Sequence, residues 1–264
     1  MSLKISACIL TYNEEENIER CISSVSFCDQ ILVVDSHSTD STRDIARSLG
    51  SDVIERDWPG FRSQREFTIE AAQHNWILFL DADEQLAPDA AVKIQELRDS
   101  GRLDQVDGYW LPRLNKYYGK YIRNGDWRSD RGLRLFDRRR AQVVGREIHE
   151  HVKCVGATAS LDATIYHESY SDIHDQLRKL SSYARLMAEA WHREGRRTNS
   201  LACLINPAWR FIRSYVLRLG FLDGWRGYVI ALAEAHYALE KYLTLIALNE
   251  GADPSYQESS TNAR

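Results

Sequence analysis

The sequence predicts an α/β fold with a mostly parallel sheet and a helical extension at its C-terminal end. Short apolar runs alternate with helical patterns over the first hundred residues, which is typical of strand–helix–strand units. Polar side chains come directly after three of these apolar runs. Beyond residue 171 the pattern changes to long helical periodicity, which indicates a separate group of helices.

The strands and helices of the first hundred residues can be placed from this alternation. We expect strands over residues 5–10, 31–34, 53–55 and 76–80, and helices over residues 14–25, 41–49 and 62–74. Strands joined through helices run parallel, and ligands bind beyond the carboxyl ends of such strands. The residues that follow each strand are therefore the first candidates for a site.

Three strand ends carry polar groups. They are Thr11, Tyr12, Asn13 and Glu14 after the first strand, Asp35 after the second, and Asp81 and Asp83 after the fourth. Neither G-x-G-x-x-G nor G-x-x-x-x-G-K-[ST] occurs in the sequence, so no glycine-rich loop is available to cradle phosphates. A nucleotide at this edge would have to be held by side chains and a metal ion.

The Asp81-Ala82-Asp83 motif is the candidate metal site. Carboxylate oxygens at a strand end suit Mg²⁺ or Mn²⁺, which take further ligands from a substrate's phosphates. The motif is short, however, and an alternative is that Asp83 caps the following helix while Asp81 is a solvated strand end.

Composition and charge indicate the compartment of the protein and the kind of ligand that it binds. The chain has 264 residues and a net charge of −4, and its five cysteines include no C-x-x-C pair, which favours a reducing compartment. The N-terminus lacks the pattern of a signal peptide, so we expect a cytoplasmic protein. Residues 113–153 hold 12 Lys+Arg against 5 Asp+Glu, which indicates an anionic ligand or surface, or else a solvated basic face.

The C-terminal region has the pattern of helices at a membrane surface. A helix is expected over residues 173–191, and Gly195 ends it. Residues 196–222 hold five arginines and several aromatic residues but no acid, which suits an anionic membrane. Residues 228–248 are apolar but include four charged or histidine side chains, so spanning a bilayer would be costly. Alternatively, these helices pack within the protein or join copies of the chain.

Three segments together resemble the inverting family 2 glycosyltransferases: 9–15 (ILTYNEE), 33–42 (VVDSHSTDST) and 80–84 (LDADE). More narrowly, His149-Glu150, the segment 134–136 (RLF) and the segment 219–224 (LGFLDG) look like the branch that includes lipopolysaccharide core β-1,4-glucosyltransferases. The resemblance implies the GT-A fold, a Rossmann-like αβα unit.

The resemblance also implies roles for particular residues. Those expected to hold the base, ribose or diphosphate of a nucleotide sugar are Thr11, Tyr12, Asn13, Glu14, Asp35, Asp40, Arg43, Asp81, Arg131 and Arg134. Asp83 would bind the metal ion. Separately from the resemblance, His149, His151 and His167 are candidates for a further ligand, with His167 preferred, although lone histidines more often have structural roles. Glu150 is the expected general base toward the acceptor hydroxyl, and Glu147 is the reserve.

This resemblance implies a metal-dependent hexosyltransferase, and UDP-glucose is the donor that we expect. We expect residues 1–105 to bind the nucleotide sugar, 106–170 to form the acceptor side, 171–252 to form the helical extension, and 253–264 to be a flexible tail. The expected partners are a lipid-linked glycan such as the lipopolysaccharide inner core and the cytoplasmic face of an anionic inner membrane. Nucleic acid is not among them. A nucleotidyltransferase and a non-catalytic membrane scaffold are the alternatives.

Overall fold

The structure is a computed structural model that describes residues 3–128, 130–145, 150–168, 170 and 172–251. The chain forms two compact units. Unit 1 consists of residues 1–116 and 129–169, and unit 2 of residues 117–128 and 170–264. The predicted division into donor half, acceptor half, helical extension and tail stays a prediction.

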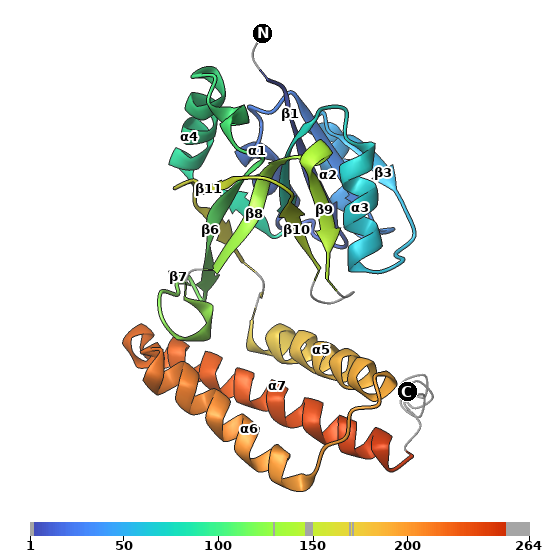
Figure 1. Ribbon diagram of the computed structural model, residues 1–264, viewed down its shortest axis with the longest axis vertical. Helices are drawn as coiled ribbons and strands as arrows, with labels where there is room; N and C mark the ends of the chain where they lie inside the picture. The colour runs from blue at the N-terminus through green and yellow to red at the C-terminus, as the bar shows by residue number, and fades with distance from the viewer. Residues whose placement is uncertain (1–2, 129, 146–149, 169, 171, 252–264) are drawn as a thin grey trace. The chain divides into compact units, whose positions relative to one another are not determined.

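Unit 1 is built around one large sheet (Figure 1). Its strands up to the middle of the chain are β1 (Ile5–Thr11), β2 (Gln30–Asp35), β3 (Asp52–Glu55), β4 (Trp76–Asp81), β5 (Glu84–Leu86), β6 (Gly108–Tyr117) and β8 (Asp130–Asp137). The later strands of this sheet are β11 (Thr158–Ser160) and β12 (Ile165–His167), whereas β9 (Ala141–Val144) and β10 (His151–Cys154) pair in a separate two-stranded sheet. The short strand β7 (Lys120–Tyr121) pairs with β6.

The order of strands along the main path of the sheet is β3-β2-β1-β4-β8-β6-β12-β5. The first four strands pair in parallel, as do β12 and β6, whereas β8 runs antiparallel to both of its neighbours. The predicted fold class, an α/β GT-A sheet with a C-terminal helical extension, is confirmed. The position of β8 between β4 and β6 could not be predicted, because both pairings join strands far apart in the sequence.

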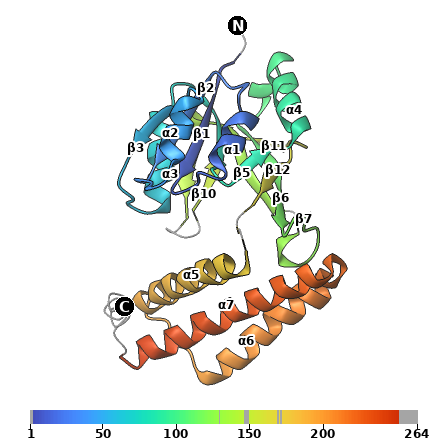
Figure 2. The ribbon, with the colours of Figure 1, turned by 180° about the vertical axis from the view of Figure 1, so that it is seen from behind.

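Helices cover both faces of this sheet (Figure 2). Those of unit 1 are α1 (Ile18–Ser24), α2 (Thr42–Ser48), α3 (Phe61–Ala71) and α4 (Pro88–Asp99), with short 3₁₀ turns at Leu103–Gln105 and Arg138–Arg140. Alternate residues of β1 separate the two cores: Ile5 and Ile9 pack with Ile18 of α1, whereas Cys8 joins the cluster that Phe67 of α3 packs against. The result is the expected αβα arrangement.

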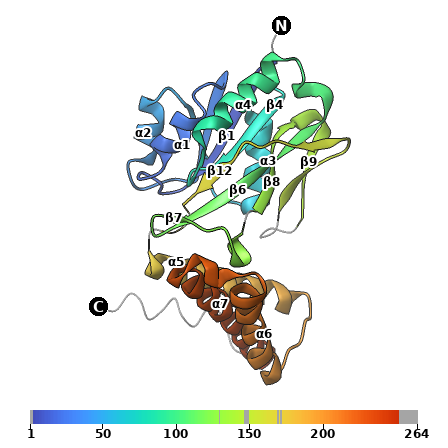
Figure 3. The same ribbon diagram turned by 90° about the vertical axis from the view of Figure 1, so that its left-hand side faces the viewer.

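Unit 2 is helical. Its elements are α5 (Ile173–Arg193), α6 (Ser200–Ile212), a π-helical turn at Arg213–Leu217, 3₁₀ turns at Gly125–Trp127 and Gly220–Asp223, and α7 (Trp225–Asn249). Helix α7 lies between α5 and α6 (Figures 1 and 3). As predicted, α5 ends just before Gly195, whose φ of +74° is easily adopted by glycine. No helix in the described part of the chain is long and apolar enough to cross a bilayer.

A buried lysine lies at the centre of unit 2. Lys241 of α7 is only 7% exposed, and its ammonium group lies 4.3 Å from the ring centre of Trp191 and 5.2 Å from that of Tyr237. Burial, with the positive charge of Arg210 as a further cause, lowers the pKa of Lys241 to about 8. The aromatic rings offset part of the cost of burying this charge.

We expect Lys241→Met to raise the Tm of unit 2 at pH 7 by roughly 2–4 °C, because the apolar side chain removes a buried charge. Below pH 8 the lysine is charged in both the folded and the unfolded chain, so the penalty is complete. Between pH 8 and 10.5 the folded protein loses this proton before the unfolded chain does. The wild type therefore gains stability with rising pH, and the difference in Tm should shrink.

Thermal unfolding of both proteins from pH 6 to 10.5 tests this expectation. Lys179→Met, which changes a more exposed lysine of α5, is the control and should change Tm little. A lower Tm for Lys241→Met at pH 7 would mean that the attraction of the rings exceeds the cost of burial.

Candidate active site

Three strand ends lie side by side at one edge of the parallel sheet. Thr11 of β1 is in register with Asp35 of β2, and Leu10 of β1 is in register with Asp81 of β4. The structure therefore brings together the groups that follow the first, second and fourth predicted strands. Thr11 carries a buried hydroxyl oxygen that has no hydrogen-bond partner among the described residues. A buried hydroxyl of this kind is costly, and a ligand at this edge could satisfy it.

The loops after β1 and β2 are hydrogen-bonded to each other. The Asn13 N–H donates to Ser38 Oγ at 2.8 Å, and the Thr39 N–H donates to Asn13 Oδ1 at 2.7 Å. Asp35 is fully buried, and its two carboxylate oxygens accept from the backbone N–H and the hydroxyl of Ser38. Asn13 has a φ of +53°, which asparagine tolerates better than most residues. We call these two hydrogen-bonded loops the ledge.

Other predicted donor-side residues take different places on the ledge. Tyr12 is 56% exposed, so its ring is available for stacking. The Glu14 N–H donates to Thr42 Oγ1 at 2.8 Å. Asp40 accepts from the backbone N–H groups of Thr42 and Glu15, and these hydrogen bonds hold its pKa below the usual value although burial opposes them. Arg43 pairs with Glu55 and lies 3.8 Å from Asp35.

A fully buried carboxylate, Glu84, lies at the centre of the site. Its Oε1 accepts from Arg134 at 2.6 Å and from Arg113 at 3.2 Å, and its Oε2 accepts from the Asp81 N–H at 3.1 Å. Arg113 also pairs with Asp130 at 2.6 Å. The two arginines come from β6 and β8, so Glu84 ties both strands to the tip of β4.

Asp81 continues this chain of alternating charges. Its Oδ2 lies 3.4 Å from Arg134, and its Oδ1 lies 3.8 Å from Arg65. Burial alone would raise the pKa of Asp81, but Arg134, Arg65 and Arg113 together lower it, so the carboxylate is ionised.

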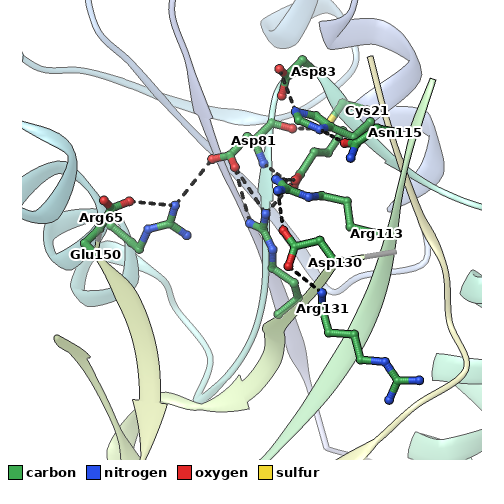
Figure 4. Close-up of polar contacts among 12 residues, drawn as sticks. Cys21, Arg65, Asp81, Asp83, Arg113, Asn115, Asp130, Arg131 and Glu150 are labelled. Atoms are coloured by element: carbon green, nitrogen blue, oxygen red, sulfur yellow. Dashed lines mark hydrogen bonds and ion pairs between the residues drawn. The ribbon is translucent and has the colours of Figure 1, made fainter. Parts of the chain in front are cut away.

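Arg65 connects Asp81 to the predicted base. Its guanidinium group lies over the ring of Phe79, 4.2 Å from the centre, and donates to Glu150 Oε1 at 3.2 Å. The Glu150 side chain is only 9% exposed. In Figure 4, Arg65 lies between Glu150 and Asp81. An ion pair of this kind holds the Glu150 carboxylate in one orientation.

Asp83 faces away from this network toward a histidine. Asp83 Oδ2 lies 3.2 Å from Nε2 of His167, and Asn115 Oδ1 lies 2.6 Å from Nδ1 of the same ring. Burial lowers the pKa of His167, but the hydrogen bond and the charge of Asp83 raise it more. Both side chains are partly exposed, at 21% and 14%.

The donor set of Asp83 and His167 fits a divalent cation that takes its remaining ligands from a substrate. A carboxylate oxygen and an imidazole nitrogen face each other, and the second ring nitrogen is oriented by an amide oxygen, as is usual for ligating histidines. The described residues contain no group of three or more His, Cys, Asp or Glu side chains arranged for a metal ion. Any cation here would therefore depend on further oxygen ligands.

One predicted residue lies elsewhere, and two lie outside the described residues. Arg131 is exposed and its side chain donates to Ser160 Oγ at 3.0 Å, outside the network around Glu84. Glu147 and His149 fall in the segment 146–149, outside the described residues. His151 begins β10, in a hairpin with β9.

Sequence reasoning assigned no role to four members of the site: Arg65, Glu84, Arg113 and Asn115. Arg65 lies in a helix whose pattern is ordinary, and Arg113 is one of many basic residues in its region. Asn115 lies two residues after Arg113 on the same strand, so their side chains lie on one face of the sheet. This spacing could have been used to predict that both belong to the site.

We expect Glu84→Gln to lower the free energy of unfolding of unit 1 by about 3 kcal/mol or more, because it removes the fully buried charge that Arg134 and Arg113 share, and their other partners, Asp81 and Asp130, are more exposed. Urea denaturation measures this. Glu96→Gln, on the exposed side of α4, is the matched control and should change stability by less than about 0.5 kcal/mol. Equal stability of the two variants would contradict a central role for Glu84.

Comparisons with known proteins agree on one family. The family model described as Glycosyl transferase family 2 matches residues 6–156. An uncharacterised glycosyltransferase of Rickettsia typhi is 28% identical over 257 residues, which cover 94% of this chain and 87% of the relative. The lipopolysaccharide core biosynthesis glycosyltransferase LpsC of Rhizobium meliloti is 27% identical over 247 residues, which cover 89% of each chain.

A solved structure resembles part of the chain. Glucosyl-3-phosphoglycerate synthase from Mycobacterium tuberculosis, in complex with Mn²⁺ and UDP-glucose, is 23% identical with a TM-score of 0.36. The match covers 43% of this chain and 44% of that one.

Proposed function

Because the chain belongs to glycosyltransferase family 2, we propose that it is an inverting hexosyltransferase that carries glucose from UDP-glucose to a lipid-linked glycan such as the lipopolysaccharide inner core. The observation that carries this proposal is that three carboxylates near one sheet edge have three different partners. Asp81 lies between arginines, Asp83 faces His167, and Glu150 pairs with Arg65. Different environments give carboxylates different chemical tasks.

The donor's nucleoside would lie on the ledge formed by the loops after β1 and β2. Asp35 and the loop residues it orders offer acceptors and donors for a base and a ribose. Tyr12 offers an exposed ring for stacking, and the Thr11 hydroxyl offers an unused hydrogen bond. Hydrogen bonds between the two loops hold these groups in place, which lowers the entropy cost of binding.

Asp83 and His167 would hold Mg²⁺ or Mn²⁺, which supplies Lewis-acid stabilisation to the leaving diphosphate. Asn115 fixes the orientation of the His167 ring for this task. Arg134 is already bound by Asp81 and Glu84, so its contribution is the field of its charge and the placement of Asp81. Arg131, which is exposed, remains the candidate for direct contact with the diphosphate.

Glu150 would accept the proton of the acceptor hydroxyl as that oxygen attacks the sugar from the face opposite the diphosphate. One base suffices in such a direct displacement, since no covalent sugar intermediate forms. Arg65 positions Glu150 relative to Asp81, and so relates the base to the donor side of the site. Glu147 remains the reserve base.

The acceptor proposal is supported by the similarity to LpsC, whose name places it in lipopolysaccharide core biosynthesis. A lipid-linked acceptor places the enzyme at a membrane surface, and we propose the cytoplasmic face of the inner membrane. Family membership favours transfer of a sugar over the nucleotidyltransferase alternative.

We expect UDP to bind the purified protein in the presence of Mn²⁺ and to bind at least about tenfold more weakly in its absence, because the cation neutralises the diphosphate next to Asp83. Asp83→Asn should abolish this dependence on Mn²⁺. Isothermal titration of UDP, GDP, ADP and CMP measures both effects.

Asp162→Asn, at an exposed carboxylate that pairs with Lys93, is the control and should bind UDP as the wild type does. Equal UDP affinity with and without Mn²⁺ would overturn the metal assignment, and the absence of binding to any nucleotide would favour the scaffold alternative.

We expect Glu150→Gln to lower kcat by about 10²–10⁴-fold while the Kd for UDP changes less than about threefold, because a neutral amide cannot take the hydroxyl proton. UDP release from UDP-glucose with a truncated lipopolysaccharide acceptor measures kcat. Glu70→Gln, at the exposed end of α3, should retain wild-type activity. Normal turnover by Glu150→Gln would assign the base to another residue.

A further inference from the structure

Helix α6 turns its apolar stripe outward. None of its residues is buried, and the apolar side chains recur at the spacing of one helical face. The stripe consists of Leu201 (58% exposed), Leu204 (71%), Ile205 (54%), Trp209 (53%) and Ile212 (45%), and Val216 (49%) continues it. A helix on a globular unit normally packs such a stripe against the core. Here the stripe is 45–71% exposed although α6 packs against α7.

More apolar side chains follow in the next turns and the start of α7. They are Leu217, Leu219, Phe221, Leu222, Trp225, Tyr228 and Leu232, all between 44% and 59% exposed. The ring of Tyr215 links these segments, since its centre lies 5.4 Å from Phe211 of α6, 6.2 Å from Phe221 and 5.6 Å from Tyr228 of α7. We call the stripe and these residues the apolar face. An exposed set of this extent marks an interaction surface.

The carboxylates near the apolar face are turned inward. Asp126 is clamped between Arg213 at 2.6 Å and Arg218 at 2.7 Å, and Glu234 pairs with Arg210 at 2.9 Å. Asp223 is 5% exposed and accepts from the backbone N–H groups of residues 123 and 124. Three arginines that the sequence predicted to meet a membrane are thus paired within unit 2.

The segment that carries the stripe holds positive charge only. Arg196 and Arg197 are exposed just before α6, and no Asp or Glu occurs from residue 196 to 222, although Arg196 pairs with Glu194 at 3.0 Å. An anionic surface can therefore approach the apolar face without meeting a like charge from this segment. Trp209, Trp225 and Tyr228 combine an apolar ring with a polar N–H or O–H, which suits the boundary between headgroups and acyl chains.

We propose that the apolar face binds an anionic lipid bilayer, with α6 lying in the plane of the interface and its stripe inserted at the headgroup–acyl boundary. The interaction is chiefly apolar, with Arg196 and Arg197 near the headgroups, and does not depend on Arg210, Arg213 or Arg218. It rests on the proposed function only in that a lipid-linked acceptor brings the enzyme to a bilayer. Outward exposure of the stripe, absence of acids and interfacial aromatic residues together favour lipid over a protein partner.

Co-sedimentation of the full chain with vesicles of phosphatidylethanolamine and phosphatidylglycerol tests the proposal. The double variant Leu204→Glu/Ile205→Glu puts two charges on the stripe without touching a buried side chain. We expect the wild type to pellet with the vesicles and the variant to bind at least about tenfold more weakly. Val92→Glu, at a 53% exposed valine of unit 1, is the matched control and should pellet like the wild type.

Titration of UDP into the same proteins separates this proposal from the proposed function. UDP affinity, which reports on unit 1, should be unchanged in Leu204→Glu/Ile205→Glu, and a helical circular dichroism signal equal to that of the wild type shows that unit 2 is folded. A wild type that stays in the supernatant, or a double variant that pellets equally, overturns the bilayer assignment. So does a wild-type dimer in light scattering that the double variant converts to a monomer, because the face would then join two copies of the chain.

Discussion

The site depends on one buried charge, the carboxylate of Glu84. With no exposed surface, Glu84 cannot exchange its partners for water, so two guanidinium groups and one backbone N–H must supply all of its compensation. Those partners come from strands β6 and β8 and from the tip of β4. Satisfying Glu84 therefore fixes how the antiparallel strands join the parallel half of the sheet.

The same network separates the tasks of the neighbouring carboxylates. Asp81 lies near Arg65 and near Arg134, which also binds Glu84. The positive charges of these two arginines keep Asp81 ionised. Asp83 faces His167 instead of the arginines. Under the proposed function, a divalent cation bound there would balance the charge of Asp83. The ion pair with Arg65 holds Glu150 near the same edge of the sheet. Alternating charge lets several carboxylates lie close together without mutual repulsion.

Unit 2 has a buried apolar core, which includes Ala188 and Leu245, but it also places several charged groups inside and several apolar groups outside. Its arginines are used inward, on Asp126 and Glu234, and a lysine is buried among aromatic rings. Its leucine-rich stripe is on the outside of α6. Such a unit exposes apolar surface at a cost, and a lipid interface would remove that cost.

The sequence by itself determined the parallel half of the fold and the edge at which the site lies. Alternating strands and helices permit few topologies, and parallel strands must end at a common edge, so Thr11, Asp35 and Asp81 were brought together by local pattern alone. Tertiary structure decided which charges pair. Arg65 and Arg113 look like any other basic residues in the sequence, and the arginines near α6 looked available to a membrane. Ion pairs between residues on different strands and helices have no periodicity, because they depend on strand order and packing rather than on neighbouring residues.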